Sequence, residues 1–155
     1  MHCLSSSTAP RHEGSLAGTM NRTLVICKPD AVERGLVGEI VGRLERKGLR
    51  LVAGALVTID PETARQHYAE HVGKGFYDAL VEFIGRSPAF VVVVEGPEDT
   101  WKIVRTLMGP TDPAAAPPGT IRGDLGTLMT ENLVHGSDSG ESAAREIGIF
   151  FPGLG

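Results

Sequence analysis

The chain has 155 residues, a formal net charge of −4, 41% hydrophobic residues and 22% charged residues. The length and composition are those of one globular domain. The acidic balance argues against a general nucleic-acid binder, which carries a basic excess, so a polyanionic substrate requires a local cluster of cations. The longest apolar run, Ala89–Val94, is too short to span a bilayer, so no membrane association is expected.

The two cysteines, Cys3 and Cys27, provide no disulfide framework and fit a reducing cytosol, so we expect a cytoplasmic protein. Residues 1–20 are rich in Ser, Ala, Gly and His and show no period, which predicts a disordered N-terminal extension. They also lack the apolar core of a signal peptide. Residues 21–155 then form a single folded domain.

Strands and helices alternate from the start of this domain. Thr23–Cys27 is a compact apolar strand that ends before Pro29, because proline cannot donate to a strand ladder. The helical period of residues 36–44 predicts a helix that ends near Gly48. Residues 49–59 alternate between apolar and other side chains, which predicts a second strand.

A helical hairpin is expected next. Asp60 and Pro61 have the pattern of a helix start, and a glycine-rich joint at 73–75 separates this helix from a second one that begins near Phe76. Residues 89–95 are apolar on both faces and predict a central strand.

The following segment predicts a helix over residues 98–108, with Trp101, Val104 and Met108 facing the core. The connection 109–127 contains four prolines and shows no period. Connections of this length are usually functional or disordered, and the prolines favour a rigid loop that holds a phosphate.

The last segment carries the strongest candidate site. A short apolar run ends in His135, and the spacing of Asp138 and Glu141 predicts a capping box and a helix start near Ser139. That helix brings Glu146 back beneath the histidine about two turns later. A carboxylate there can fix the imidazole tautomer and leave the other ring nitrogen as a nucleophile. Taken alone, the pattern favours a structural histidine that is hydrogen-bonded in place.

Residues 132–139, Asn-Leu-Val-His-Gly-Ser-Asp-Ser, closely resemble the active-site signature Asn-x-x-His-x-Ser-Asp-Ser of nucleoside diphosphate kinases, and the resemblance extends from about Thr23 to Pro152. It implies that His135 is transiently phosphorylated. The implied reaction moves the γ-phosphoryl group from a nucleoside triphosphate to a nucleoside diphosphate in two steps. ATP and other nucleoside tri- and diphosphates are the implied substrates, with Mg²⁺ held mainly by their phosphates.

The same resemblance implies the other site residues. Nine positions look like the nucleotide-binding set: Lys28, Tyr68, His71, Phe76, Leu80, Arg105, Thr111, Arg122 and Asn132. Ser137 and Glu146 match the pair that orients the histidine, and Asp138 is placed to reach the Mg²⁺ ion through a water molecule. Without the family, Lys28 fits a surface lysine and Phe76 fits plain core.

Alternation of strands and helices alone favours a doubly wound parallel sheet. The resemblance implies instead an α+β fold, with a ferredoxin-like, mainly antiparallel four-stranded sheet and helices packed on it, and we expect this arrangement. It also implies a homo-oligomer, with a hexamer favoured over a tetramer. Ala31, Gly75 and Arg86 depart from the family pattern outside the proposed catalytic set, and Gly75 predicts a looser nucleotide-binding hairpin.

Two other functions remain open at this point. One is a phosphohistidine relay that passes the group to a protein partner, and the other is a catalytically silent nucleotide-binding or nucleic-acid-binding module. The intact signature and the acidic charge argue against the silent module. The sequence has no Walker-type phosphate loop, no protein-kinase motif and no cysteine–histidine spacing typical of zinc.

Overall fold

The computed structural model describes residues 21–154, and the predicted extension 1–20 lies outside this range. One four-stranded sheet has the strand order β2–β3–β1–β4. Its strands are β1 (Asn21–Cys27), β2 (Arg50–Val57), β3 (Ala89–Gly96) and β4 (Val134–Gly136). The three neighbouring pairs are all antiparallel. The predicted ferredoxin-like α+β fold is therefore confirmed, and the parallel alternative is wrong.

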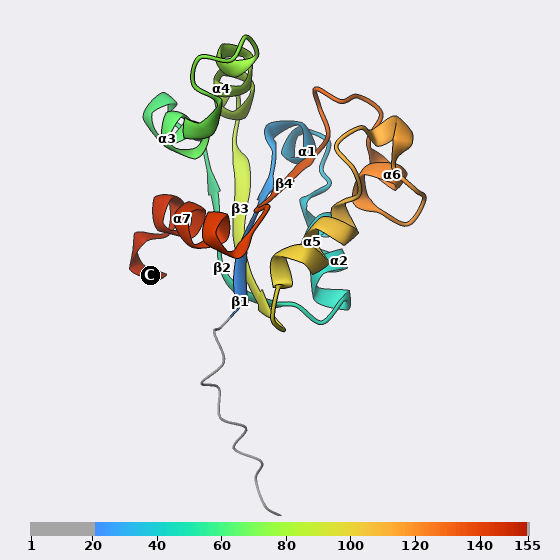
Figure 1. Ribbon diagram of the computed structural model, residues 1–155. Helices are drawn as coiled ribbons and strands as arrows, with labels where there is room; N and C mark the ends of the chain where they lie inside the picture. The colour runs from blue at the N-terminus through green and yellow to red at the C-terminus, as the bar shows by residue number, and fades with distance from the viewer. Residues whose placement is uncertain (1–20, 155) are drawn as a thin grey trace, which may run out of the picture.

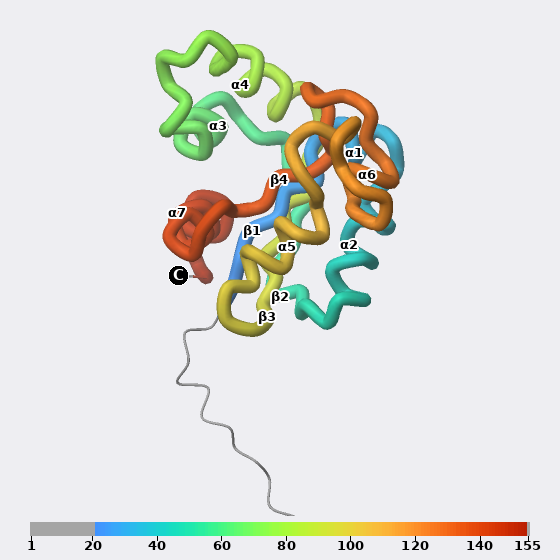
Figure 2. The backbone as a smooth tube through the Cα atoms, turned by 45° about the vertical axis from the view of Figure 1, so that its right-hand side comes forward, coloured from blue at the N-terminus to red at the C-terminus, as the bar shows by residue number. Residues whose placement is uncertain are grey.

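Helices cover both faces of this sheet (Figures 1 and 2). One face carries α1 (Pro29–Glu33), α2 (Val37–Arg46), α5 (Thr100–Met108) and α6 (Ile121–Leu125). The other carries α3 (Pro61–His67), α4 (Tyr77–Gly85) and α7 (Gly140–Phe150). Short 3-10 turns are η1 (Ala69–His71), η2 (Pro113–Ala115) and η3 (Pro152–Leu154). None of the helices in residues 21–154 is both long and apolar enough to cross a membrane.

The alternation of β1 divides the core into two layers. Leu24 and Ile26 pack toward α3, α4 and α7, whereas Val25 and Cys27 pack toward α2 and α5. All four side chains are fully buried, and burying one such side chain stabilises a fold by about 1.5–3 kcal/mol. The predicted central strand is confirmed as β3, which lies between β2 and β1. The two inner strands are β3 and β1, and β1 holds β4, which carries His135, at a fixed position.

The ends of the helices follow from local hydrogen bonds. Asp60 caps α3 as predicted, because its carboxylate accepts the N–H of Thr63 at 2.8 Å. Helix α7 is capped by Ser139, whose hydroxyl accepts the N–H of Ser142 at 2.9 Å. The predicted capping box at Asp138 is therefore wrong by one residue, although the helix starts where it was expected.

Three further predictions need correction. Pro29 ends β1 but also opens the short helix α1, where a missing N–H has no cost. The connection 109–127 is not free of regular structure, because it contains η2 and α6. Trp101 is only half-buried, whereas Val104 and Met108 lie in the core as predicted.

Candidate active site

The candidate nucleophile lies on the short edge strand β4. His135 pairs with Ile26 of β1, and its side chain is 25% exposed toward a cavity of about 140 Å³. Gly136 follows it because a Cβ at that position would lie 2.5 Å from the sulfur of Met108. Close packing of β4 on α5 thus fixes the strand that presents the imidazole.

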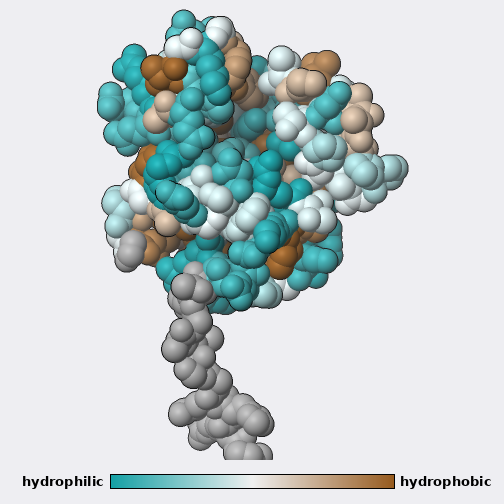
Figure 3. Space-filling view, in the orientation of Figure 1, coloured by the Kyte–Doolittle hydropathy of each residue, from teal (hydrophilic) through white to brown (hydrophobic). Residues whose placement is uncertain are grey.

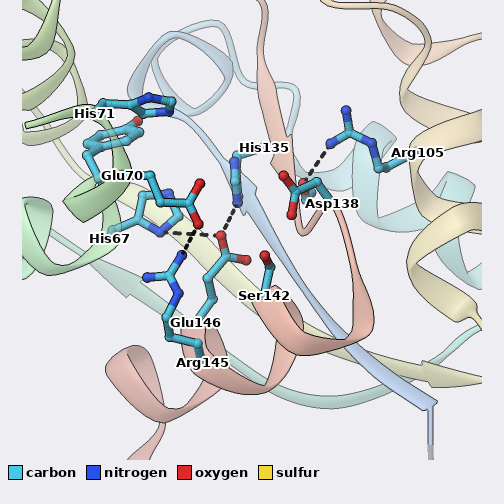
Figure 4. Close-up of a pocket in the computed structure, with 11 residues that line it drawn as sticks. His67, Glu70, His71, Arg105, His135, Asp138, Ser142, Arg145 and Glu146 are labelled. Atoms are coloured by element: carbon cyan, nitrogen blue, oxygen red, sulfur yellow. Dashed lines mark hydrogen bonds and ion pairs between the residues drawn. The ribbon is translucent and has the colours of Figure 1, made fainter. Parts of the chain in front are cut away.

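Helix α7 places a carboxylate directly behind this imidazole (Figure 4). Nε2 of His135 lies 3.0 Å from Oε1 of Glu146, and the hydroxyl of Ser137 donates to Oε2 of the same carboxylate. Burial alone raises the pKa of Glu146, but the hydrogen bond and charge of His135, together with the Ser137 hydrogen bond, leave that pKa lowered. The carboxylate is therefore ionised at neutral pH.

This geometry selects one tautomer of His135. An ionised carboxylate only accepts hydrogen bonds, so Nε2 must carry the proton of the neutral ring. The lone pair then resides on Nδ1. Ser137 and Glu146, predicted as the orienting pair, are thus positioned to keep Nδ1 available as a nucleophile.

Arg122 is almost fully buried and acts as a clamp on the backbone around the site. Its nitrogens donate to the carbonyls of Gly109, Asn132 and Val134 at 3.0, 3.1 and 2.7 Å. Burial and then the charge of Arg105 lower the pKa of Arg122 to about 10, so it remains charged at neutral pH. The clamp joins the proline-rich connection to β4, immediately before His135.

A second chain of contacts starts at Lys28, at the end of β1. Its ammonium donates to Oδ1 of Asn132 at 2.8 Å, and the amide nitrogen of Asn132 donates to the carbonyl of Thr111 at 2.9 Å. Burial, followed by the charge of Arg122, lowers the pKa of Lys28 to about 8. The structure therefore connects three of the predicted nucleotide-binding residues directly to one another.

The residue after Asn132 has an unusual backbone. Leu133 has a φ of 73°, in the left-handed region that a branched side chain rarely occupies. Such a residue costs roughly 1–3 kcal/mol and persists only where its surroundings determine it. The Leu133 side chain is fully buried. The backbone N–H of Leu133 donates to Asp30 at 3.0 Å, and its backbone carbonyl accepts the N–H of Lys28 at 2.8 Å. These contacts hold the turn that aims Asn132.

The α3–α4 hairpin forms one wall of the region. Tyr68 is buried and lines the cavity together with His71, and burial followed by the charge of Glu146 raises the pKa of Tyr68 to about 12. Phe76 lies at the hairpin tip with half of its surface exposed, and its ring centroid is 5.5 Å from that of His71. Leu80 lies one turn further along α4 and packs partly into the core.

Arg105 of α5 forms the opposite wall. Its guanidinium donates to the carbonyl of Gly136 at 3.0 Å, which places the cation beside the strand that carries His135. Asp138 is exposed and lines the same cavity. Figure 4 shows the imidazole between these two side chains and the α3 wall.

The predicted residues therefore fall into three groups around the imidazole. Six of them line the cavity: Tyr68, His71, Arg105, His135, Asp138 and Glu146. A second group lies beside it: Lys28, Thr111, Arg122 and Asn132 form one hydrogen-bonded network, and Ser137 is bonded separately to Glu146. Phe76 and Leu80 lie on the hairpin and do not line this cavity.

Besides Gly136, sequence reasoning missed four residues whose side chains line the cavity: His67, Glu70, Ser142 and Arg145. His67 is the most consequential, because its ring contacts the ring of His135 edge-on with a centroid distance of 4.5 Å. Burial, followed by the charge of His135, lowers the pKa of His67 to about 3, so the ring is neutral. No local signal identified it, because the contact joins α3 to a strand far along the chain.

Comparison with known proteins agrees with this geometry. The family model for nucleoside diphosphate kinase matches residues 21–154. The chain is 59% identical over 134 residues to a nucleoside diphosphate kinase from Streptomyces griseus, covering 86% of this chain and 97% of that protein. It is 56% identical over 132 residues to one from Archaeoglobus fulgidus, covering 85% of this chain and 87% of that protein.

Solved structures give the same answer. A nucleoside diphosphate kinase from Halobacterium salinarum in complex with CDP is 52% identical, with a TM-score of 0.82, covering 85% of this chain and 88% of that chain. A nucleoside diphosphate kinase family protein from Babesia bovis is 45% identical, with a TM-score of 0.84. The match covers 87% of this chain and 90% of that chain. An oriented imidazole beside cationic side chains, on a fold shared along almost the whole domain, shows that the chain belongs to the nucleoside diphosphate kinase family.

Proposed function

We propose that His135 carries the phosphoryl group between nucleotides in a nucleoside diphosphate kinase reaction. The observation that supports this role most directly is the 3.0 Å contact between Nε2 of His135 and Glu146, which leaves Nδ1 with the lone pair. The ring is partly exposed to the cavity, so a phosphate can reach it. A general nucleotide-binding module has no need of an imidazole held in this way.

The first half-reaction is a displacement at the γ-phosphorus of a nucleoside triphosphate. The Nδ1 lone pair of His135 forms the N–P bond, and the bond from phosphorus to the bridging oxygen breaks, with its electron pair leaving on the diphosphate. The ring then carries a positive charge, which the carboxylate of Glu146 stabilises through Nε2–H. In the second half-reaction a terminal oxygen of another diphosphate attacks phosphorus, and the electron pair of the N–P bond returns to Nδ1.

Charge neutralisation comes from the cations around the imidazole. Arg105 lines the cavity and contacts Gly136, and Lys28 contacts Asn132 in the network beside the cavity. Arg122 supports the backbone of that network and adds a buried positive charge. Phosphoryl transfer needs mainly such positioning and neutralisation. Orientation of the reactants is worth roughly 7–11 kcal/mol of the barrier.

Kinases of this family generally require a divalent metal, and we propose Mg²⁺. The exposed carboxylate of Asp138 fits such an ion, because Mg²⁺ prefers oxygen donors and retains several waters when it is bound through phosphates and one carboxylate. When bound, the ion would neutralise charge on the transferred phosphoryl group. A cytoplasmic location remains a prediction from the cysteine content.

Base binding is proposed on the α3–α4 hairpin. The half-exposed ring of Phe76 offers an aromatic face, and stacking on such a face is available to every base. We therefore propose that purine and pyrimidine nucleotides are both substrates.

Exchange among nucleotides tests this function directly. The protein is incubated with γ-labelled ATP, freed from nucleotide, and then mixed with GDP, CDP or UDP. We expect stoichiometric labelling of the protein, followed by complete transfer of the label to each diphosphate. Label that remains on the protein would instead support a relay to a protein partner, and absence of labelling would contradict phosphotransfer altogether.

We also propose a homo-oligomer that uses the free edge of the sheet. Strand β2 lies at one edge, and Leu51, Leu56 and Val57 on it are 38%, 60% and 36% exposed. An exposed apolar edge strand is a ready site for pairing with a second copy. The face in Figure 3, by contrast, is mainly hydrophilic, with its apolar residues in small separate groups.

Sedimentation velocity checks this assembly. The wild-type chain should sediment as an oligomer, with a hexamer as our first expectation. Leu56→Lys should shift it toward smaller species, because a buried lysine in the pairing edge is costly. Glu82→Lys on the exposed surface of α4 serves as the matched control. A wild-type monomer at all concentrations would contradict the proposal.

A further inference from the structure

His67 has unused hydrogen-bonding capacity next to the nucleophile. Its side chain is only 2% exposed, and neither ring nitrogen has a hydrogen-bond partner among residues 21–154. A neutral imidazole carries one N–H and one lone pair, and leaving either without a partner in a buried position is unfavourable. Nδ1 of this ring lies 3.8 Å from Oε1 of Glu146, the oxygen that also faces His135. Figure 4 shows both rings directed at this carboxylate.

We propose that His67, His135 and Glu146 bind a transition-metal ion of the zinc class, and that an ion bound there stops phosphotransfer. The possible ligand atoms of the three side chains lie within 4.8 Å of one another. Zinc bonds of about 2.0–2.2 Å in a tetrahedral site place neighbouring ligand atoms roughly 3.3–3.6 Å apart, so shifts of about 1 Å bring these atoms into position. The fourth position faces the cavity, where water can complete the shell.

Carboxylates of the cavity offset part of the positive charge around this point. The cavity is lined by three carboxylates, those of Glu70, Asp138 and Glu146, against the guanidinium groups of Arg105 and Arg145. The second oxygen of Glu146 is already held by Ser137, which orients the first toward the metal position. Such outer contacts are typical of metal sites.

The donor set also separates this site from the magnesium that accompanies nucleotides. Imidazole nitrogen suits zinc, copper and nickel, whereas Mg²⁺ prefers oxygen ligands and retains its waters. Two nitrogens and one carboxylate oxygen therefore favour the zinc class. An excess of Mg²⁺ should not displace such an ion.

Occupancy and phosphorylation exclude each other because of the proton on His135. A neutral imidazole has one lone pair, and a metal held beside Glu146 takes the lone pair of Nε2. The proton must then lie on Nδ1, which leaves that nitrogen unable to attack phosphorus. This consequence depends on the proposed role of His135, whereas binding of the ion does not.

Metal binding is tested first, without nucleotide. The full chain is titrated with buffered Zn²⁺, and with Co²⁺ as a spectroscopic probe whose intense visible bands report a tetrahedral environment. We expect one such site per chain. His67→Phe and His67→Gln should weaken it by about 100-fold or more, since even changes in residues that only support metal ligands cost about 10–100-fold.

Two control variants separate this site from others. His71→Gln alters a neighbouring histidine of the same cavity that is not in the proposed ligand set. Cys3→Ser alters a thiol that lies outside the described residues and is a possible zinc ligand. Both variants should bind the ion as the wild type does. Thermal unfolding of each variant confirms that it is folded.

Inhibition is tested second, by measuring the rate of phosphoenzyme formation in excess Mg²⁺. Each rate with zinc is divided by the rate of the same variant without zinc. The zinc concentration that halves phosphoenzyme formation should rise by about 100-fold in both His67 variants, in line with their loss of affinity. Equal binding by the wild type and the His67 variants, or loss of binding in Cys3→Ser, would overturn the site. Binding that depends on His67 but does not inhibit would overturn only the claim that the bound ion stops phosphotransfer. A wild type that binds the ion but does not exchange nucleotides would refute the proposed function alone.

Discussion

Replacing His135 with glutamine should reduce nucleotide exchange by about 10⁴-fold or more, because no other group can supply the covalent intermediate. Glutamine retains a polar side chain of similar reach but has no nucleophilic nitrogen. The measurement is labelling by γ-labelled ATP under single-turnover conditions, together with steady-state exchange. The variant should bind ADP nearly as the wild type does, since the imidazole contacts the transferred phosphoryl group.

Two further variants make this result specific. His71→Gln changes the other partly exposed histidine of the cavity and should still be labelled at saturating ATP, because its role is in nucleotide binding and not as the nucleophile. Glu146→Gln should still be labelled, but about 10–100-fold more slowly, because a hydrogen bond to a charged group is worth about 1.5–3 kcal/mol. Glu141→Gln on the exposed side of the same helix is the matched control for this change. Label retained by His135→Gln would remove the assignment of the nucleophile.

Substitution of Arg122 by methionine should produce the largest loss of stability among the site residues, about 3–5 kcal/mol. Methionine fills a similar volume but leaves three carbonyls without this donor, those of Asn132 and Val134 in buried contacts and that of Gly109 in a partly buried one. For a chain of this size the loss corresponds to a drop of roughly 10 °C in the midpoint of thermal unfolding. Exchange should fall as well, since the clamp holds the backbone immediately before His135.

Arg46→Met provides the comparison for this change. That arginine is 68% exposed on α2 and makes only a distant ion pair with Glu39, so its loss should change stability by less than about 0.5 kcal/mol. Unfolding is followed by calorimetry and by urea titration. If Arg122→Met were as stable as Arg46→Met, the buried guanidinium would not be holding the loop.

The elements that sequence reasoning found are those with long, regular patterns. The period of α2 and the apolar run of β3 are long enough to be recognised from the sequence. Helices α1 and α6 have five residues each, too few to show a period, and they exist because tertiary contacts hold them. The antiparallel pairing came from the family resemblance, since local patterns carry no information about strand direction.

The candidate site shows the same division. The relation between His135 and Glu146 lies within one strand–turn–helix unit, so spacing alone was enough to predict it. Burial of Lys28 and Arg122 could not be predicted, because a cation at a strand end or in a loop is usually solvated. His67 was missed because its contact with His135 depends on how two distant elements pack.

The exposed face of Phe76 has a consequence for metabolism. In the proposed binding mode this ring stacks on any base, so the enzyme does not distinguish which nucleotide donates and which receives. Since one phosphoanhydride bond is broken and an equivalent one is made, the overall equilibrium lies near unity. Such a catalyst brings the triphosphate-to-diphosphate ratio of every nucleotide to that of the most abundant pair. Phosphorylation of one nucleotide therefore maintains the triphosphates of all the others.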